Sequence, residues 1–252
     1  EGREEADWLR ALHAAASRSV AALGASMPDF ETFWEDGVFV LPDPATEPCL
    51  LDDFRRDPDA HRLKTPSGRI ELFSETIAGF GYPDCPGHPA WIEPDEWLGS
   101  AAAADYPLHL LSTQPERRLH SQLDSTGYSR DGKVAGREPL RLNPDDAARR
   151  GIRDGDVVLV RSARGRCLAA AVVSDALRPG VAHLATGAWY DPDGAGEDPL
   201  DRHGNPNTLT LDKGTSRLAQ GPSAQTCLVE VERFADGPPP PVRSFVPPTI
   251  IG

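Results

Sequence analysis

The hydrophobic pattern near the start of the chain is helical. Between residues 4 and 23, Trp8, Val20 and other apolar residues recur at the three- and four-residue spacing of one helix face, and Gly24 follows where a helix would end. Residues 27–57 mix aromatic residues with prolines, which is typical of an irregular segment laid against a larger body. We therefore expect one amphipathic helix here and little other regular structure.

A turn and a connector are expected before residue 104. Residues 65–74 show the pattern of a tight turn followed by a short alternating strand. Residues 82–104 are rich in Pro, Gly and Ala, and they predict a connector around a short helical piece at residues 94–98. We place a domain boundary near residue 104.

Strand patterns dominate the chain after residue 104. Short apolar or alternating runs predict strands at residues 108–112, 157–161, 167–173, 181–185 and 226–232. The second and third of these flank a short turn and predict a β-hairpin. The loop of residues 113–138 carries few apolar anchors, and a loop of that length is usually functional or disordered.

One short helix and a proline-rich tail complete the pattern. Asn143 is a favoured cap residue, Pro144 suits the first helical position and Gly151 follows basic residues, so residues 143–151 predict a helix. Residues 237–252 are rich in proline and are expected to be extended or flexible. Several strands, one helix and a last strand from far along the sequence together predict a small β-barrel.

Composition narrows the classes of function. With 26 Lys and Arg against 39 Asp and Glu, the formal net charge is -13, which repels phosphate backbones, so we expect no nucleic-acid binding. The four cysteines are far apart, which favours free thiols and a cytoplasmic location, with the periplasm as the alternative. No apolar run approaches the roughly 20 residues of a spanning helix, so we expect no membrane insertion.

Polar side chains cluster in the loop after the first predicted strand of the barrel. The amides of Gln114 and Gln122 both donate and accept hydrogen bonds, as a heterocycle with donor and acceptor edges requires. Arg118 and His120 suit phosphate oxygens. The loop therefore predicts a site for a polar ligand, and a solvated surface loop with its own turn hydrogen bonds is the alternative.

A second polar segment follows directly on a predicted strand end. Gly187 and Ala188 leave backbone amides open to close approach, and Trp189 offers a flat aromatic face. Packing of Trp189 against a barrel rim is the alternative interpretation. Residues 204–207 and 214–221 add further amides and hydroxyls, which are also compatible with ordinary turns.

Signals for catalysis or for a metal centre in this chain are weak. Cys85 and His88 form an isolated pair without two further ligands at a recognised spacing. The sequence contains no nucleophile elbow, P-loop or dinucleotide glycine motif. Neighbouring carboxylates such as Asp145 and Asp146 are typical of solvated charges at a helix cap. We assign no catalytic residue and no metal ligand.

Taken in order, seven motifs resemble the dimethyl sulfoxide reductase family. They are residues 65–74, 114–122, 143–147, 154–156, 187–192, 204–207 and 211–216. Within the family, the runs at 118–122 and 203–221 look closest to biotin sulfoxide and trimethylamine N-oxide reductases. Gln114 stands where several relatives carry His, which shifts the likeness toward the biotin sulfoxide branch. The resemblance covers residues from about 27 to 234.

The resemblance implies a fold and a cofactor. The fold is mainly β with short helices: an irregular α/β extension (residues 1–104), a six-stranded double-psi β-barrel (105–236) and the tail (237–252). The cofactor is bis-molybdopterin guanine dinucleotide with molybdenum. Three loops are expected to meet at one rim of the barrel and bind it through Ser112, Gln114, Arg118, His120, Ser121 and Gln122, through Gly187, Ala188 and Trp189, and through Asn207, Gln220 and Gly221.

The implied function is that of the cofactor-binding part of a molybdenum-dependent S- or N-oxide reductase. The metal-ligating serine and most of the substrate pocket of the family lie upstream of the sequence given, so we expect this chain alone to bind without catalysing. The implied partners are the N-terminal remainder of the same enzyme and a small S- or N-oxide, and a separate electron donor is compatible with this scheme. The sequence does not tell which oxide is the substrate.

Two alternatives stay open at this stage. The missing metal ligand is also compatible with a free-standing β-barrel that serves as a ligand-binding or interaction module. Formate dehydrogenases and nitrate reductases share the barrel, although the run at residues 118–122 argues mildly against them.

Overall fold

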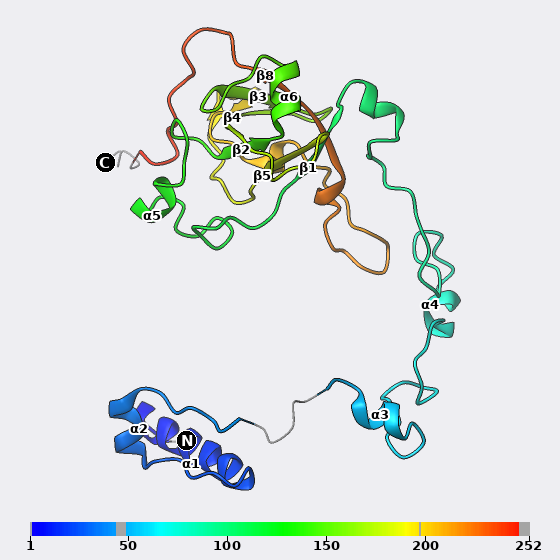
Figure 1. Cartoon of the computed structure of the whole chain (residues 1–252), viewed down its shortest axis with the longest axis vertical. Helices are drawn as coiled ribbons and strands as arrows, with labels where there is room; N and C mark the ends of the chain where they lie inside the picture. Colours follow the sequence, from blue (N-terminus) through cyan, green and yellow to red (C-terminus); the bar gives the residue numbers. More distant parts are fainter. Residues whose placement is uncertain (1, 44–48, 197, 247–252) are drawn as a thin grey trace. The chain divides into compact units, whose positions relative to one another are not determined.

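The computed structural model describes residues 2–43, 49–196 and 198–246 (Figure 1). The chain divides into two compact units, Glu1–Glu71 and Leu72–Gly252. The boundaries expected near residues 104 and 236 are not tested by this division and stay a prediction. Within the described ranges, none of the helices has both the length and the apolar character needed to cross a bilayer.

The first unit consists of short helices. Helix α1 (Glu5–Ala22) begins with a capping box between Glu4 and Asp7, which satisfies backbone N–H groups that have no partner inside the helix. It confirms the helix expected at residues 4–23. Helices α2 (Phe30–Asp36) and α3 (Asp52–Arg56) follow, in the segment expected to be irregular.

The strand expected within residues 65–74 is not formed. The turn before it is present, since the N–H of Gly68 donates to the carbonyl of Thr65 at 3.0 Å and Gly68 has a φ of +72°. Residues 70–74 then adopt no strand, and helix α4 (Glu75–Gly79) begins directly after them. An alternating pattern becomes a strand only beside a hydrogen-bonding neighbour, and the ladders of the described sheet do not include this segment.

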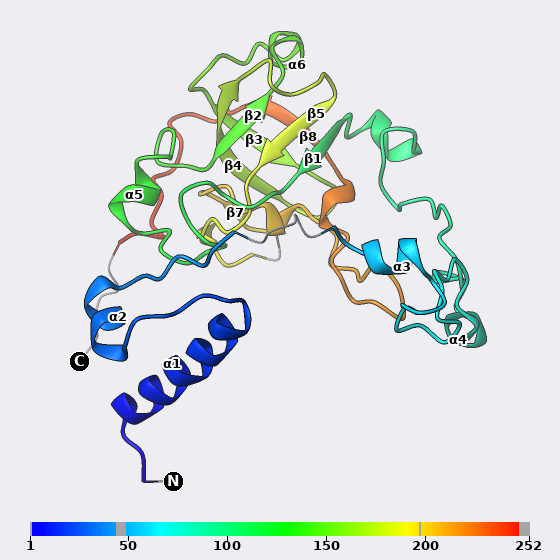
Figure 2. The same ribbon diagram turned by 60° about the horizontal axis from the view of Figure 1, so that its bottom comes forward.

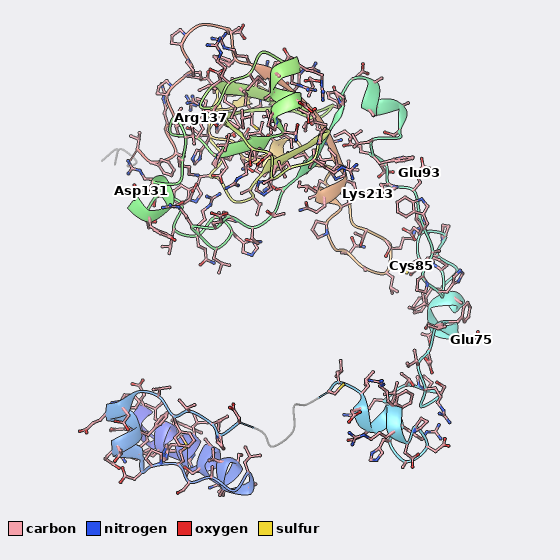
Figure 3. The ribbon with its side chains drawn as sticks, viewed as in Figure 1. Glu75, Cys85, Glu93, Asp131, Arg137 and Lys213 are labelled. Atoms are coloured by element: carbon pink, nitrogen blue, oxygen red, sulfur yellow. The ribbon has the colours of Figure 1, made fainter. Side chains whose placement is uncertain are left out.

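The helical piece expected at residues 94–98 is also wrong. The helical turn comes later, as η1 (Ala101–Ala104). The carboxylate of Glu96 instead accepts hydrogen bonds from the guanidinium of Arg164 and from the N–H of Leu228, at 2.8 Å. Nζ of Lys213 likewise lies 2.6 Å from a carboxylate oxygen of Asp95. Figure 3 shows Lys213 next to the connector, close to Glu93. These contacts fix the connector to the barrel at the place where a free helix was expected.

Six strands form a closed barrel (Figure 2). They are β1 (Leu108–Leu111), β2 (Pro139–Leu142), β3 (Val157–Arg161), β4 (Arg166–Val173), β5 (Val181–Leu184) and β8 (Cys227–Arg233). The order is β2-β5-β1-β8-β3-β4, and β4 returns to pair with β2. Closure leaves no unpaired edge in the ring. The pairs β1–β5 and β2–β4 are parallel and the others are antiparallel.

The barrel confirms the predicted fold class, a mainly β chain with a six-stranded double-psi β-barrel. Five strands lie where the sequence predicted them, and β2 is the one that was not predicted. Alternate side chains such as Leu110, Leu140, Val158 and Leu184 are fully buried in its core. Helix α6 (Pro144–Arg149) is confirmed, with Asn143 as its cap. Two short strands, β6 (Pro192–Asp193) and β7 (Leu200–Asp201), extend the sheet beside β4.

Part of the tail is attached to the barrel unit by hydrogen bonds. Arg137 donates to the carbonyl of Pro240, and the backbone N–H groups of Arg243 and Ser244 donate to the carboxylate of Asp191. Residues 239–243 have no helix or strand, and residues 243–246 form a turn in which the N–H of Val246 donates to the carbonyl of Arg243 at 2.8 Å. Residues 247–252 of the tail expected to be extended or flexible lie outside the described part of the chain.

Candidate functional site

Three loops of the barrel meet at one cleft of about 570 Å³. The loops follow β1, β5 and β7 along the chain. The lining residues are His120, Ser121, Thr186, Gly187, Ala188, Trp189, Tyr190, Asn205 and Asn207. Amides, hydroxyls, an imidazole and two aromatic faces are therefore gathered from segments far apart in sequence.

Gly187 allows the first two loops to touch. Its φ is +89°, and a Cβ added to it would lie 1.9 Å from the carbonyl oxygen of His120, a distance that no side chain tolerates. Two hydrogen bonds reinforce this approach. The indole Nε1–H of Trp189 donates to the carbonyl of Ser121 at 2.7 Å, and Arg118 donates to the carbonyl of Thr186 at 2.9 Å.

His120 presents an imidazole at the cleft. Its φ of +52° is the left-handed conformation that non-glycine residues seldom adopt, and such strain often accompanies a functional position. The side-chain amide nitrogen of Gln114 lies 3.0 Å from Nδ1 of His120. The same nitrogen lies 3.5 Å from Nε2, and because an amide nitrogen only donates, Nδ1 accepts in the shorter contact.

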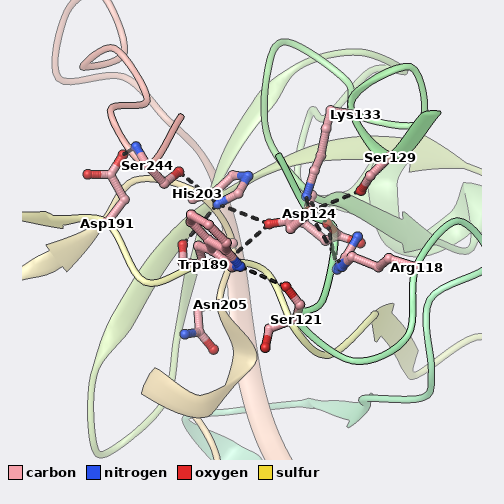
Figure 4. A network of polar contacts seen from close by, with 12 residues as sticks. Arg118, Ser121, Asp124, Ser129, Lys133, Trp189, Asp191, His203, Asn205 and Ser244 are labelled. Atoms are coloured by element: carbon pink, nitrogen blue, oxygen red, sulfur yellow. Dashed lines mark hydrogen bonds and ion pairs between the residues drawn. The ribbon is translucent and has the colours of Figure 1, made fainter. Parts of the chain in front are cut away.

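Arg118 does not line this cleft; it lines a separate hollow of about 210 Å³ together with Gln114, Lys133 and Glu138. Its side chain is 3% exposed and forms ion pairs with Glu138 at 3.1 Å and Asp124 at 3.4 Å. Lys133 pairs with the same two carboxylates, at 2.6 Å and 2.8 Å, so two cations balance two anions (Figure 4). Burial acts to raise the pKa of Asp124, but the hydrogen bond and charge of Lys133 and the charge of Arg118 outweigh it and lower that pKa.

Asp124 connects this charge network to the second loop. One carboxylate oxygen accepts from the hydroxyl of Ser129 at 3.1 Å, and the other accepts from the backbone N–H of Trp189 at 3.1 Å. The buried ion pairs therefore hold Trp189 at the rim of the cleft.

The structure brings together six of the twelve predicted site residues as lining of one cleft, namely His120, Ser121, Gly187, Ala188, Trp189 and Asn207. Gln114 and Arg118 do not line the cleft, but each forms a hydrogen bond with His120, which does. Thr186, Tyr190 and Asn205 were missed, although each is within two residues of a predicted position, which was the available signal.

The other four predicted residues lie away from the cleft lining. The backbone N–H and carbonyl of Ser112 are both bonded to the side chain of Gln225, at 3.0 Å and 2.7 Å. Gln122 closes a turn through its N–H, and the amide of Gln220 donates to a carbonyl within its own loop. Gly221 lies in that same loop. A cofactor role for these four residues stays a prediction.

A second hollow continues the cleft. It encloses about 300 Å³ and shares Tyr190, Asn205 and Asn207 with the first. Arg164, Arg166 and Asp198 also line it, with Arg166 3.8 Å from Asp198 and Arg164 paired with Glu96. A ligand longer than one ring system therefore has a continuous path across this face of the barrel. Among the described residues, no cluster of three or more His, Cys, Asp or Glu could hold a metal ion.

The fold and the cleft describe a closed β-barrel with a polar hollow where three loops meet, and sequence comparison adds a family likeness. Residues 108–228 match the family model of the Molydopterin dinucleotide binding domain. That segment contains β1 and all three loops of the cleft. Over these residues the chain is similar to this domain family, whose description names a molybdopterin dinucleotide as the bound group.

Three curated relatives confirm the predicted resemblance to the dimethyl sulfoxide reductase family. The chain is 47% identical to dimethyl sulfoxide/trimethylamine N-oxide reductase of Cereibacter sphaeroides over 94% of its length. It is 50% identical to biotin sulfoxide reductase of the same organism over 97%, and 48% identical to trimethylamine-N-oxide reductase 1 of Escherichia coli K12 over 93%. The chain spans only 28–32% of the length of these relatives.

A solved structure supports the fold alone. Acetylene hydratase from Pelobacter acetylenicus matches 71% of this chain and 25% of its own, with a TM-score of 0.57 and 23% identity.

The residues of the cleft fit such a cofactor. None of the nine lining residues, all within the described ranges, is acidic, although the chain carries 39 acidic residues against 26 basic ones. An anionic pyrophosphate therefore meets no carboxylate there, and hydroxyl, amide and imidazole groups are available to its oxygens and to the edges of its ring systems.

Proposed function

We propose that this chain binds the molybdopterin guanine dinucleotide cofactor of a larger S- or N-oxide reductase, in which two such dinucleotides hold one molybdenum. The observation that carries the proposal is the convergence of three loops at a cleft free of carboxylates in an acidic chain. The names of the relatives supply the reaction class, since they are reductases of sulfoxides and N-oxides.

Each loop of the cleft contributes a different kind of contact. His120 offers an imidazole, and Ser121 and Asn207 offer a hydroxyl and an amide. Trp189 presents an aromatic face for a flat ring, and its indole N–H is already satisfied by Ser121, so the face is oriented before the ligand arrives. Gly187 lets the first two loops lie in contact, which fixes the position of the second loop in the cleft.

These contacts suggest which part of the whole protein binds the dinucleotide and which part completes the metal and substrate sites. When bound, the cofactor supplies the redox-active metal centre, and the protein orients and tunes it. The residues of this chain grip the dinucleotide and shield it from water, while an N-terminal remainder completes the metal and substrate sites. The proposal includes a separate protein that donates electrons to the enzyme. It also includes a cytoplasmic location, which cell fractionation would test.

Loading of the full-length protein tests the proposal. We expect the purified protein to contain molybdenum and a guanine nucleotide, and to reduce dimethyl sulfoxide, trimethylamine N-oxide or biotin sulfoxide with a chemical electron donor. Trp189→Ala removes the aromatic face and is expected to lower cofactor content about tenfold. Trp91→Ala, at a tryptophan that is 80% exposed and outside the cleft, serves as the matched control. A protein with neither molybdenum nor reductase activity contradicts the proposal.

A further inference from the structure

The C-terminal tail contacts residues that follow the lining of the cleft in sequence. The backbone N–H groups of Arg243 and Ser244 donate to one carboxylate oxygen of Asp191, which is two residues beyond Trp189 in the second loop. The ring of Phe245 packs edge-on against the imidazole of His203, with 4.8 Å between ring centroids. Figure 4 shows Ser244 and Trp189 both next to the imidazole of His203, with contacts to the same ring nitrogen.

His203 joins the tail to the second loop. Its side chain is fully buried, and its Nδ1 lies 2.9 Å from the carbonyl of Trp189 and 3.1 Å from the hydroxyl of Ser244. A carbonyl oxygen only accepts, so Nδ1 carries the proton. Among the described residues, Nε2 of His203 has no hydrogen-bond partner. The polar contacts of this imidazole are therefore concentrated at Nδ1, between the tail and Trp189.

The hydrogen-bonding groups of Trp189 are held from two sides. The first loop provides Asp124, which accepts from its backbone N–H, and Ser121, which accepts from its indole N–H. Within the described part of the chain, the carbonyl of Trp189 has Nδ1 of His203 as its only hydrogen-bond partner. Loss of the His203 contact would leave this side of the loop anchored only through Asp191.

We propose that residues 240–245 form a strap that positions the second loop of the cleft, and that His203 is the positioning residue that connects the strap to Trp189. His203 does not line the cleft, so it acts through Trp189 and not on the ligand. The identity of the ligand rests on the proposed function, but the effect of the strap on Trp189 does not.

Two substitutions at His203 separate this role from a general packing role. His203→Leu fills the space but cannot donate to the carbonyl of Trp189. His203→Asn places an amide N–H near the position of Nδ1, so the hydrogen bond to the carbonyl of Trp189 can still form. The substitution removes Nε2, but that atom makes no hydrogen bond among the described residues. We expect cofactor to dissociate from the full-length His203→Leu protein about tenfold faster, and from His203→Asn within about twofold of the wild-type rate.

Fluorine NMR of the full-length protein labelled with 5-fluorotryptophan reports on Trp189 directly. The Trp189 resonance is assigned as the one that disappears from the spectrum of the Trp189→Phe protein. We expect His203→Leu and Phe245→Ala to shift or broaden this resonance, and His203→Asn to restore it. Phe80→Ala, at an exposed phenylalanine outside the cleft, is the matched control and should leave it unchanged.

Measurements on the cofactor-free protein distinguish failure of the strap proposal from failure of the proposed cofactor-binding function. If the wild-type protein holds a different ligand, the Trp189 resonance in cofactor-free samples still responds to His203→Leu, and the strap stands while the proposed function fails. If His203→Leu and Phe245→Ala lower the melting temperature but leave both the Trp189 resonance and the dissociation rate unchanged, the residues are packing residues only and the strap is overturned.

Discussion

At the scale of single residues, Gly187 decides whether the cleft exists. Its backbone conformation and the nearby carbonyl of His120 each exclude a side chain, by strain and by collision. The two effects can be separated because Gly194 has a φ of +100° with nothing within 4 Å of a Cβ. Gly194 therefore carries the strain without the collision.

Gly187→Ala is expected to force the first two loops apart. Strain alone costs about 1–2 kcal/mol, and the collision with His120 adds to it, so the melting temperature should fall by more than it does in Gly194→Ala. Cofactor content should fall with it. Calorimetry and metal analysis of both variants check this. Equal effects of the two substitutions would show that the approach to His120 has no importance.

His203 also makes stability depend on pH. Burial lowers its pKa, and so does the charge of Lys133, while Asp124 and Asp201 act in the opposite direction. The folded protein therefore keeps His203 neutral at pH values where the unfolded chain takes up a proton. Stability contributed by the neutral imidazole is present above about pH 6.5 and is lost as the pH falls from there toward the folded-state pKa.

The expected slope is at most about 1.4 kcal/mol per pH unit for this one proton. The melting temperature of wild-type protein should drop more steeply between pH 7.5 and 5.5 than that of His203→Asn, because the amide does not titrate. Parallel profiles for the two proteins would contradict the assignment.

At the scale of elements, the short strand β7 organises the turn that supports the strap. Asp201, at its end, accepts the backbone N–H of Asp191 at 2.8 Å on one oxygen and those of His203, Gly204 and Asn205 on the other, at 3.3, 2.8 and 2.7 Å. Burial raises the pKa of Asp201, although these donors act to lower it. Each of the four donors requires an acceptor, which the two carboxylate oxygens provide.

Asp201→Asn is expected to destabilise the protein by about 2–3 kcal/mol, because the amide NH₂ would face backbone N–H groups in place of an acceptor. Asp193→Asn, at an exposed carboxylate of the neighbouring strand β6, is the matched control and should change little. Denaturant unfolding of the two variants measures the difference. If Asp201→Asn is as stable as the control, the turn is held by other contacts.

Local patterns predicted the elements well where local physics decides them. The cap at Asn143 and the alternation in the last strand each depend on neighbours in sequence, and both were confirmed. Strand β2 was missed because its four residues begin with Pro139 and form a strand only between β4 and β5. The predicted role of Arg118 in binding a ligand stays a prediction, whereas its pairing with Asp124 and Glu138 could not be predicted because it depends on the folded loop and leaves no signature in the sequence.

At the scale of the whole molecule, the two compact units differ in how much apolar surface they bury. Val20 is the buried hydrophobic residue among the described positions of the first unit, whereas the barrel buries a continuous core. Ordering a residue costs about 1–2 kcal/mol of backbone entropy, which burial of apolar side chains must offset. In the first unit, α1 and α2 leave an apolar groove of about 530 Å³ beside Val20 and Phe33.

Residues 1–71 expressed alone are therefore expected not to fold cooperatively. Short helices with so little buried surface are marginal in water, so circular dichroism should show low helix content and a broad, shallow thermal change. The same helices in the full-length protein should be protected from hydrogen exchange, since the relatives aligned with this unit extend far beyond it. A sharp two-state transition in the isolated segment would mean that these helices are stabilised by contacts within the unit, and that its groove needs no cover.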